Sequence, residues 1–312
     1  MRPPHPVPLA RARLLTSPSV SPSLVRELER IAGRPADTAV PDGPFVYVGD
    51  ALPEALRTPR LLWFHSVNAG TDALLSAGPW PEGALLTRTV GRMGERIAQY
   101  VLGWVLAECQ AVPEHTAQHA RGEWRRLPSE LAAGRTVVVH GTGRIGSAVA
   151  GLLRACALRT VGVSRTARGP VPGFDRVVTA GSDEEATALG EARWVVSTLP
   201  STGATEGFFD AGRFTAMRGA TFVNVGRGAT VDMTALGAAL HAGTLRGAVL
   251  DVLPAEPAAP GDPVWRLPRT VITSHSAGIT AEEDVVADFA ACWADVAGGR
   301  TPALAVDTRR GY

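Results

Sequence analysis

Several features are scarce in this sequence, and each scarcity excludes a class of protein. Only three of the 312 residues are cysteine, at positions 109, 156 and 292, and no two form a CxxC pair. This disfavours a disulfide framework or a zinc cage and fits a reducing compartment. The net charge is only +1, so the chain has no strong field to attract nucleic acid or an anionic membrane.

Long apolar runs are missing as well. We find no run of about 18 apolar residues and no signal-like segment near the first residue. We therefore expect a cytoplasmic protein that acts on small molecules, without nucleic-acid or membrane partners.

Short apolar runs alternate with stretches that have helical periodicity. Hydrophobic content is 45% and charged content 20%, which is ordinary for a globular protein, and 312 residues suggest two domains. In the first part of the chain, the patterns predict helices over residues 23–32 and 71–77 and strands over 12–15, 45–48, 61–64 and 84–87.

A second series of strands follows a helix predicted over residues 95–107, which Pro113 closes. Its runs are rich in β-branched residues without polar alternation, which is typical of strands buried on both faces of a parallel sheet. These runs are 136–139, 160–163, 176–178, 194–198, 221–225, 247–250 and 271–273. A last helix over 281–297 leads back towards the first unit, so we predict a doubly wound α/β sheet inserted into a smaller α/β domain.

A glycine turn follows the first strand of the second series. Gly141, Gly143 and Gly146 form a GxGxxG pattern, which is weak alone because 34 of the 312 residues are glycine. Its position between a strand and a helix is what favours a dinucleotide site. There, the first glycine allows the tight turn, the second lets the backbone approach the pyrophosphate, and the third allows close helix–strand packing. A plain glycine-rich turn remains the alternative.

The next strand ends on Ser164-Arg165-Thr166, with Arg168 close by. An NAD site usually has a carboxylate there for the ribose hydroxyls, whereas an arginine pairs with a 2′-phosphate. The sequence therefore favours NADP(H) over NAD(H). In the alternative, Arg165 only covers the adenine edge and cofactor choice is loose.

Three later segments place reactive side chains after strand ends. Arg227 lies between two glycines, and its guanidinium can bind a carboxylate and polarise a carbonyl. His275 is a suitable proton donor to the oxyanion left by hydride transfer, and Glu256 can fix its tautomer. Spacing alone leaves open whether His275 and Glu256 meet, and structural roles are an equal alternative.

The remaining histidines and one tryptophan are weaker candidates. His115 and His119 have helical metal-pair spacing but no third ligand, so we predict no metal site. A substrate contact by His65 is open, whereas packing is favoured for His140 and a core position for Trp265.

Taken together, the segments resemble the D-isomer-specific 2-hydroxyacid dehydrogenases, in particular their glyoxylate/hydroxypyruvate reductase-like branch. The ordered Arg, Glu and His set is more specific than the glycine pattern. The resemblance runs over nearly the whole chain and rests on residues 67–72, 98–103, 141–146, 199–202, 224–228, 251–257 and His275.

The resemblance implies a fold and a role for each of the candidate site residues. Residues 1–90 and 279–312 would form a flavodoxin-like substrate domain, and residues 91–278 a Rossmann cofactor domain. Arg227 would bind the substrate carboxylate and carbonyl, with His275 as acid/base and Glu256 as its partner. The backbone at Ala69 and Gly70 would hold the substrate carboxylate. Cofactor contacts would come from Gly141, Gly143, Arg144, Ile145, Gly146, Ser164, Arg165, Thr166, Leu199, Pro200, Thr205, Val225, Gly226 and, at the nicotinamide amide, Asp251.

The chain departs from the family pattern at four positions. Ser274 replaces the common proline before the catalytic histidine, and Ser276 replaces an apolar residue after it. Gln99 stands where glutamate is common, and His140 where an apolar residue is usual. None of these removes a catalytic group, but Ser276 puts substrate choice in doubt.

The sequence thus predicts an enzyme that reduces a small 2-keto acid with NADPH, with His275 as proton donor. The resemblance further implies that the product is the D-2-hydroxy acid and that the enzyme is a homodimer. Two alternatives stay open: the same fold acting on an aryl or phosphonate keto acid of specialised metabolism, and a cofactor-sensing protein with little turnover.

Overall fold

The computed structural model describes residues 9–37, 39–40, 42–166 and 169–308 and divides into two compact units. Unit 1 comprises the residues up to Met93 together with those from Thr280 onward, and unit 2 is Gly94–Ile279. Among the described residues, no helix is long and apolar enough to cross a membrane.

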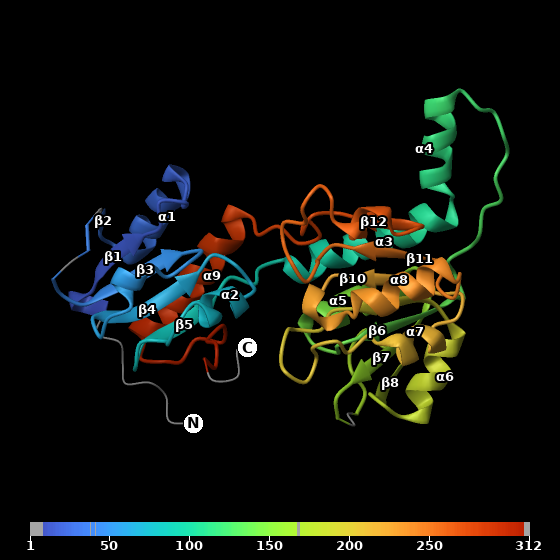
Figure 1. Cartoon of the computed structure of the whole chain (residues 1–312). Helices are drawn as coiled ribbons and strands as arrows, with labels where there is room; N and C mark the ends of the chain where they lie inside the picture. Colours follow the sequence, from blue (N-terminus) through green and yellow to red (C-terminus); the bar gives the residue numbers. More distant parts are fainter. Residues whose placement is uncertain (1–8, 38, 41, 167–168, 309–312) are drawn as a thin grey trace. The chain divides into compact units, whose positions relative to one another are not determined.

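Unit 1 is built on a parallel sheet in the order β2-β1-β3-β4-β5, the strand order of flavodoxin-like folds (Figure 1). Four of its strands were predicted, while the two-residue β2 was too short to produce a pattern. The strands are β1 (Arg13–Thr16), β2 (Ala36–Asp37), β3 (Phe45–Gly49), β4 (Leu61–Ser66) and β5 (Leu85–Arg88).

Helices from both ends of the chain complete unit 1. The helix α1 (Pro22–Ala32) begins after the N-cap Ser21 and ends at the left-handed Gly33. It packs against α9 (Glu282–Ala297), whose Phe289 stacks on Trp63 of β4. The segment after α9 bonds to β5 at Leu86, where Val306 donates its N–H. Shorter elements are η1 (Leu9–Arg11), η2 (Glu54–Leu56) and α2 (Asp72–Ser76).

Unit 2 contains the predicted doubly wound sheet, which is parallel throughout, in the order β12-β11-β10-β9-β6-β7-β8. The chain builds β6, β7 and β8 outward, then returns to β9 on the other side of β6. The switch point of the sheet therefore lies between β6 and β9, where ligands bind in open α/β folds. The strands are β6 (Thr136–His140), β7 (Arg159–Ser164), β8 (Arg176–Thr179), β9 (Ala192–Ser197), β10 (Thr221–Asn224), β11 (Gly247–Leu250) and β12 (Thr270–Ile272).

An aromatic and aliphatic core supports this sheet. Phe209, Phe214 and Phe222 are fully buried together and pack in tilted, stacked and edge-on pairs. The helices and short turns of unit 2 are α3 (Met93–Cys109), α4 (Val112–Arg121), α5 (Arg144–Ala155), α6 (Asp183–Glu191), α7 (Ala211–Ala216), α8 (Met233–His241), η3 (Gly228–Thr230) and η4 (Pro263–Arg266).

An arm leaves unit 2 after α3. The chain turns at the left-handed Ala111, and Pro113 lies in the first turn of α4, where a missing N–H costs no hydrogen bond. Pro113 therefore separates two helices and does not simply end one. Figure 1 shows α4 and the segment after it extending away from the sheet, and Trp124 in that segment is fully exposed.

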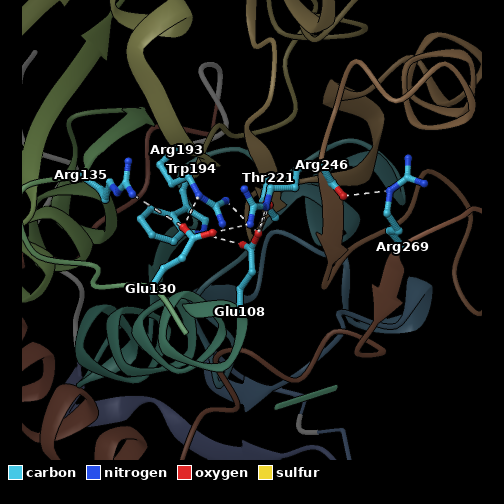
Figure 2. A network of polar contacts seen from close by, with 8 residues as sticks. All are labelled: Glu108, Glu130, Arg135, Arg193, Trp194, Thr221, Arg246 and Arg269. Carbon is cyan, nitrogen blue, oxygen red and sulfur yellow. Dashed lines mark hydrogen bonds and ion pairs between the residues drawn. The ribbon is translucent and has the colours of Figure 1, made fainter. Parts of the chain in front are cut away.

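The base of the arm is fixed by an ionic network that the sequence did not reveal (Figure 2). Glu108, before the arm, binds Arg193 at 2.8 Å and Arg246 at 3.2 Å, and Glu130, after the arm, binds Arg246 at 2.7 Å. Glu108 also accepts hydrogen bonds from Trp194 Nε1 and Thr221 Oγ1. These partners lie at the amino ends of their strands, so the network occupies the sheet edge opposite the glycine turn.

Candidate active site

Most of the site residues predicted from the sequence lie at the carboxyl edge of the sheet in unit 2. Because all seven strands are parallel, the residues that follow β6, β7, β9, β10, β11 and β12 emerge at this same edge. The glycine turn follows β6, Arg165 follows β7, Arg227 follows β10, and His275 follows β12.

The three glycines of the turn differ in what a side chain at each position would meet. Gly141 has a left-handed φ of 98°, and a Cβ on it would lie 2.5 Å from Thr198 Oγ1. A Cβ on Gly146 would lie 1.9 Å from the carbonyl oxygen of Gly141. Among the described residues, a Cβ on Gly143 would meet no atom within 4 Å. Packing within the chain thus explains the first and third glycines but not the second, for which the predicted approach of a cofactor stays a prediction.

The helix after this turn fits a dinucleotide phosphate. The helix α5 begins at Arg144 with Gly143 as N-cap, and no side chain caps its first N–H groups. Both residues are exposed. Uncapped N–H groups at the positive end of a helix bind phosphate oxygens. Ile145, also predicted to contact the cofactor, lies in the first turn of this helix.

Alanine at position 143 is expected to weaken cofactor binding roughly 10-fold or more without lowering the melting temperature. The φ of Gly143 is −81°, which alanine adopts freely, so the added methyl hinders only a ligand. Titration of NADPH and thermal unfolding of Gly143→Ala measure the two effects. Gly146→Ala is the contrast, because its clash with Gly141 destabilises the fold. Unchanged cofactor affinity in Gly143→Ala would contradict the assignment.

The end of β7 presents a hydroxyl and a guanidinium in different ways. Ser164 is buried, and its hydroxyl donates to the carbonyl of Thr166 at 2.6 Å. Arg165 and Thr166 are exposed. Ser164 therefore shapes the turn while Arg165 is available to an anion. Arg168 lies outside the described residues.

A loop after β9 connects the glycine turn to Arg227. Thr198 Oγ1 donates to the carbonyl of His140 at 3.0 Å, and Thr205 Oγ1 donates to the carbonyl of Pro200 at 2.6 Å. A Cβ on Gly226 would lie 2.5 Å from the carbonyl oxygen of Leu199, so the two backbones are in close contact. The predicted cofactor residues Leu199, Pro200, Thr205, Val225 and Gly226 therefore belong to two adjoining segments of the sheet edge.

Arg227 is held between two close backbone contacts. Behind it, Gly226 packs against Leu199. Ahead of it, a Cβ on Gly228 would lie 1.9 Å from the carbonyl carbon of Leu253. Asn224 Nδ2 donates to the carbonyl of Arg227 at 3.2 Å. The Gly-Arg-Gly sequence is thus required by packing on both sides, and it fixes the backbone that carries the guanidinium.

The side chains of His275 and Glu256 are in contact. The spacing in the sequence had left this question open. Their Nδ1 and Oε2 atoms are 2.7 Å apart, and the second oxygen of Glu256 accepts the N–H of Leu253 at 2.7 Å. The side chain of His275 is 54% exposed, and this contact occupies Nδ1 and leaves Nε2 as its other ring nitrogen. The contact of Gly228 with Leu253 also links Arg227 to the segment that carries Glu256.

Asp251 shapes the turn that presents His275. It is 3% exposed, and its Oδ1 accepts hydrogen bonds from Thr273 Oγ1 at 2.6 Å and from the N–H groups of Ser276 and Ala277. Its carbonyl accepts the N–H of His275 at 2.7 Å. The role implied for Asp251 at the nicotinamide stays a prediction, whereas this anchoring role was not visible in the sequence.

The turn itself is left-handed. Ser274 and His275 have φ values of 54° and 56°, a region that costs a non-glycine residue about 1–3 kcal/mol. The ring of proline fixes φ near −65°, so the proline common in the family has no place in this turn.

Tyr100 of α3 extends the anchoring of this turn. Its hydroxyl lies 2.7 Å from Thr273 Oγ1, and Thr273 donates its own proton to Asp251. Tyr100 must therefore be the donor to Thr273. Burial raises the pKa of Tyr100 to about 12, which keeps the donating proton in place.

In unit 1, Ala69 and Gly70 lie in the loop between β4 and α2. Arg88 Nη1 donates to the carbonyl of Ala69 at 3.2 Å. Over the described ranges, the N–H groups of Ala69 and Gly70 donate to no other residue of the chain. His65, at the end of β4, is fully buried, so the substrate contact left open for it is wrong.

The other candidates have structural positions. His140 is buried and its Nε2 lies 2.8 Å from Glu185, as packing predicted, and burial lowers the pKa of this histidine. The core position predicted for Trp265 is wrong, because its side chain is 48% exposed. His115 and His119 are exposed on α4, and the described part of the chain contains no group of three or more metal-ligating residues.

Comparison with known proteins points to one family. The family model "D-isomer specific 2-hydroxyacid dehydrogenase, NAD binding domain" matches residues 102–277. Over 278 residues, which cover 89% of this chain and 99% of the relative, the sequence is 58% identical to an uncharacterized protein in the mprR 3′ region of Streptomyces coelicolor. It is 31% identical over 260 residues to glyoxylate/hydroxypyruvate reductase A of Serratia proteamaculans, covering 81% and 82% of the two chains.

Solved structures agree with this similarity. A D-isomer specific 2-hydroxyacid dehydrogenase from Xanthobacter autotrophicus, in complex with NADPH and MES, matches with a TM-score of 0.85 at 28% identity, over 96% of this chain and 99% of that one. An NADPH-dependent glyoxylate/hydroxypyruvate reductase from Sinorhizobium meliloti, in complex with NADP and sulfate, matches with a TM-score of 0.80 at 26% identity, over 97% and 100% of the two chains.

Proposed function

The chain belongs to the D-isomer-specific 2-hydroxyacid dehydrogenase family, and on this premise we propose that it reduces glyoxylate, hydroxypyruvate or a similarly small 2-keto acid with NADPH. The similar sequences and structures indicate that the protein is an NAD(P)-dependent dehydrogenase of this family. The pairing of His275 with Glu256, beside the clamped Arg227, is the observation that carries the proposal. Support for the substrate class comes from the relatives named as glyoxylate/hydroxypyruvate reductases.

The chain's own groups divide the chemistry among them. When bound, the nicotinamide supplies the hydride for the carbonyl carbon. Arg227 binds the substrate carboxylate and polarises the carbonyl. Glu256 holds Nδ1 of His275, which leaves Nε2 to donate a proton to the carbonyl oxygen as negative charge develops there. We further propose that the backbone of Ala69 and Gly70 binds the carboxylate.

A substrate panel tests this proposal. Glyoxylate, hydroxypyruvate, and aryl and phosphonate keto acids are offered with NADPH, and oxidation of the cofactor is followed by its absorbance. We expect the two small keto acids to have the highest kcat/KM. A higher kcat/KM for an aryl or phosphonate keto acid would contradict the proposed substrate class and identify the other one. Tight cofactor binding with no turnover of any substrate would contradict the proposed enzyme activity and indicate a cofactor sensor.

The preference for NADPH is proposed to come from Arg165. Replacing it with aspartate is expected to raise KM for NADPH by roughly 10- to 100-fold, because a hydrogen bond to a charged group is worth about 1.5–3 kcal/mol. KM for NADH should fall, since the new carboxylate can accept from the ribose hydroxyls. Steady-state kinetics with both cofactors measure the ratio. An NADPH/NADH preference that does not move in Arg165→Asp would show that Arg165 has no role in cofactor choice.

The homodimer implied by the family stays a proposal. The exposed Trp124 and Leu131, which follow α4 on the arm, support it, since large apolar side chains gathered on one segment mark interaction surfaces. Sedimentation of the full chain tests the stoichiometry.

A further inference from the structure

A chain of hydrogen bonds runs through the core of unit 1 towards the loop of Ala69 and Gly70. Trp63 Nε1 lies 2.8 Å from Thr87 Oγ1, which is 2.7 Å from Nδ1 of His65. On the far side of the ring, Nε2 lies 3.2 Å from Thr89 Oγ1, which donates to the carbonyl of Ser66 at 3.1 Å. All five residues are at most 1% exposed, so water does not compete for these bonds.

The bonds at the two ends of this series favour one direction along it. A carbonyl only accepts, so Thr89 donates its hydroxyl proton to Ser66 in this geometry, and His65 Nε2–H is then the donor to Thr89. An indole N–H only donates, so Trp63 gives its proton to Thr87. The hydroxyl of Thr87, which also bonds to the Cys292 thiol, can then donate to Nδ1. Both ends are therefore satisfied by the same neutral tautomer of His65, with its proton on Nε2.

The surroundings of His65 maintain this neutral state. The ring packs edge-on against Trp63 and Phe289, and burial lowers its pKa to about 3. A second ring proton on Nδ1 would also oppose the Thr87 hydroxyl. His65 therefore stays neutral over the range in which a dehydrogenase works.

The chain of bonds ends where the loop of Ala69 and Gly70 begins. The carbonyl of Ser66 accepts from both the N–H and the hydroxyl of Thr89, while the N–H of Val67 in the same peptide unit donates to Gly49. The hydroxyl of Ser66 in turn bonds to the backbone of Asn68. The plane of this peptide unit is thus held at both ends, and it sets the direction in which the loop leaves β4.

We propose that His65 and Thr89 are positioning residues, which orient the backbone of residues 67–70 for a substrate carboxylate. The proposal rests on the proposed role of Ala69 and Gly70 in carboxylate binding. It assigns a specific task to a histidine that touches no substrate: a residue at position 65 must accept from Thr87 and donate to Thr89 at the same time. A neutral histidine does this, whereas an apolar residue of equal size removes one hydrogen-bond partner from each threonine.

The first test reads the tautomer in the unmodified protein. In ¹⁵N-labelled protein, long-range ¹H–¹⁵N correlation spectra of His65 should show the proton on Nε2 alone, unchanged from pH 5 to pH 8. A proton on Nδ1, or titration of the ring within this range, would overturn the direction of the chain. His65→Asn identifies the resonances. The result does not depend on any activity, so it separates this inference from the proposed function.

The second test compares two matched threonines. Thr89→Val removes the bond to Ser66, whereas Thr87→Val makes the same chemical change one step farther from the loop, at an equally buried position. By hydrogen exchange, the amides of residues 67 and 68 should exchange about fivefold faster in Thr89→Val, which corresponds to losing about 1 kcal/mol. Thr87→Val should raise this rate less, because it leaves the bond between Thr89 and Ser66 in place, and Thr89→Ser should restore the original rate. Equal effects of the two valine variants would overturn the proposal.

Kinetics connect the loop to the substrate. In Thr89→Val we expect KM for the keto acid to rise several-fold, with KM for NADPH unchanged, and Thr89→Ser should recover the original value. Faster exchange of the loop without any change in KM would overturn its link to carboxylate binding. Absence of keto acid turnover in the unmodified protein would instead count against the proposed function, and the exchange experiment would still decide the structural part.

Discussion

Replacing His275 with glutamine is expected to lower kcat/KM for the keto acid by about 10²- to 10⁴-fold, the contribution typical of a positioned general acid. Glutamine keeps a polar side chain of similar reach, but its amide is too weak an acid to transfer a proton to the oxyanion. The affinity for NADPH should stay within about twofold, because His275 is expected to act on the substrate carbonyl. Steady-state kinetics and a fluorescence titration of the cofactor measure the two quantities.

A matched variant separates chemistry from a general loss of structure. His241 is exposed on α8, where its Nδ1 bonds to the carbonyl of Gly237, and His241→Gln should leave kcat/KM unchanged. Near-normal turnover in His275→Gln would remove this residue from the mechanism. Equal losses in kcat/KM and in cofactor affinity would make it a binding residue. Glu256→Gln should show a smaller loss, because it disturbs the orientation of the imidazole without removing it.

Alanine at position 228 is expected to have an effect of similar size by a different route. The added Cβ would lie 1.9 Å from the carbonyl carbon of Leu253 and 2.3 Å from the nitrogen of Pro254, so the two backbones must separate. The separation moves Arg227 on one side and the segment carrying Glu256 on the other. A displacement of about 1 Å in such a constellation costs about 10²-fold in rate. Overpacking should also lower the free energy of unfolding by about 1–3 kcal/mol.

Gly190 provides the control for this substitution. It is exposed on α6, and within the described part of the chain a Cβ there would meet no atom within 4 Å. Gly190→Ala should be neutral or stabilising by up to about 1 kcal/mol, with full activity. Kinetics and denaturant unfolding of both variants test the comparison. A fully active Gly228→Ala enzyme would mean that the contact with Leu253 does not position the site.

Much of the fold was predictable because parallel strands leave a strong local pattern. Strands such as 136–139 and 221–225 are short runs buried on both faces, and their polar ends are easy to recognise. In a parallel sheet, those ends must meet at one edge. The sequence could therefore place Arg227 and His275 at the same edge without knowing any contact between them.

The features that escaped prediction depend on contacts distant in sequence or on backbone conformation. The anchoring by Asp251 requires Thr273 and Ser276 to be adjacent in space, more than 20 positions away. The left-handed φ values at Ser274 and His275 leave no mark in composition, because neither residue is glycine. The network of Glu108 and Glu130 joins residues whose charges look like ordinary surface charges when they are read in order.

The split of unit 1 between the two ends of the chain has a consequence for biosynthesis. Unit 2 is continuous in sequence, so all of its strands leave the ribosome before α9 does. Unit 1 cannot finish folding until the last part of the chain is made, because α9 covers its sheet and the segment at Val306 bonds to β5. We therefore expect a nascent chain that ends near residue 279 to carry a folded second unit beside a first unit with exposed apolar surface. Exposed apolar surface of this kind promotes aggregation, which chaperones counteract.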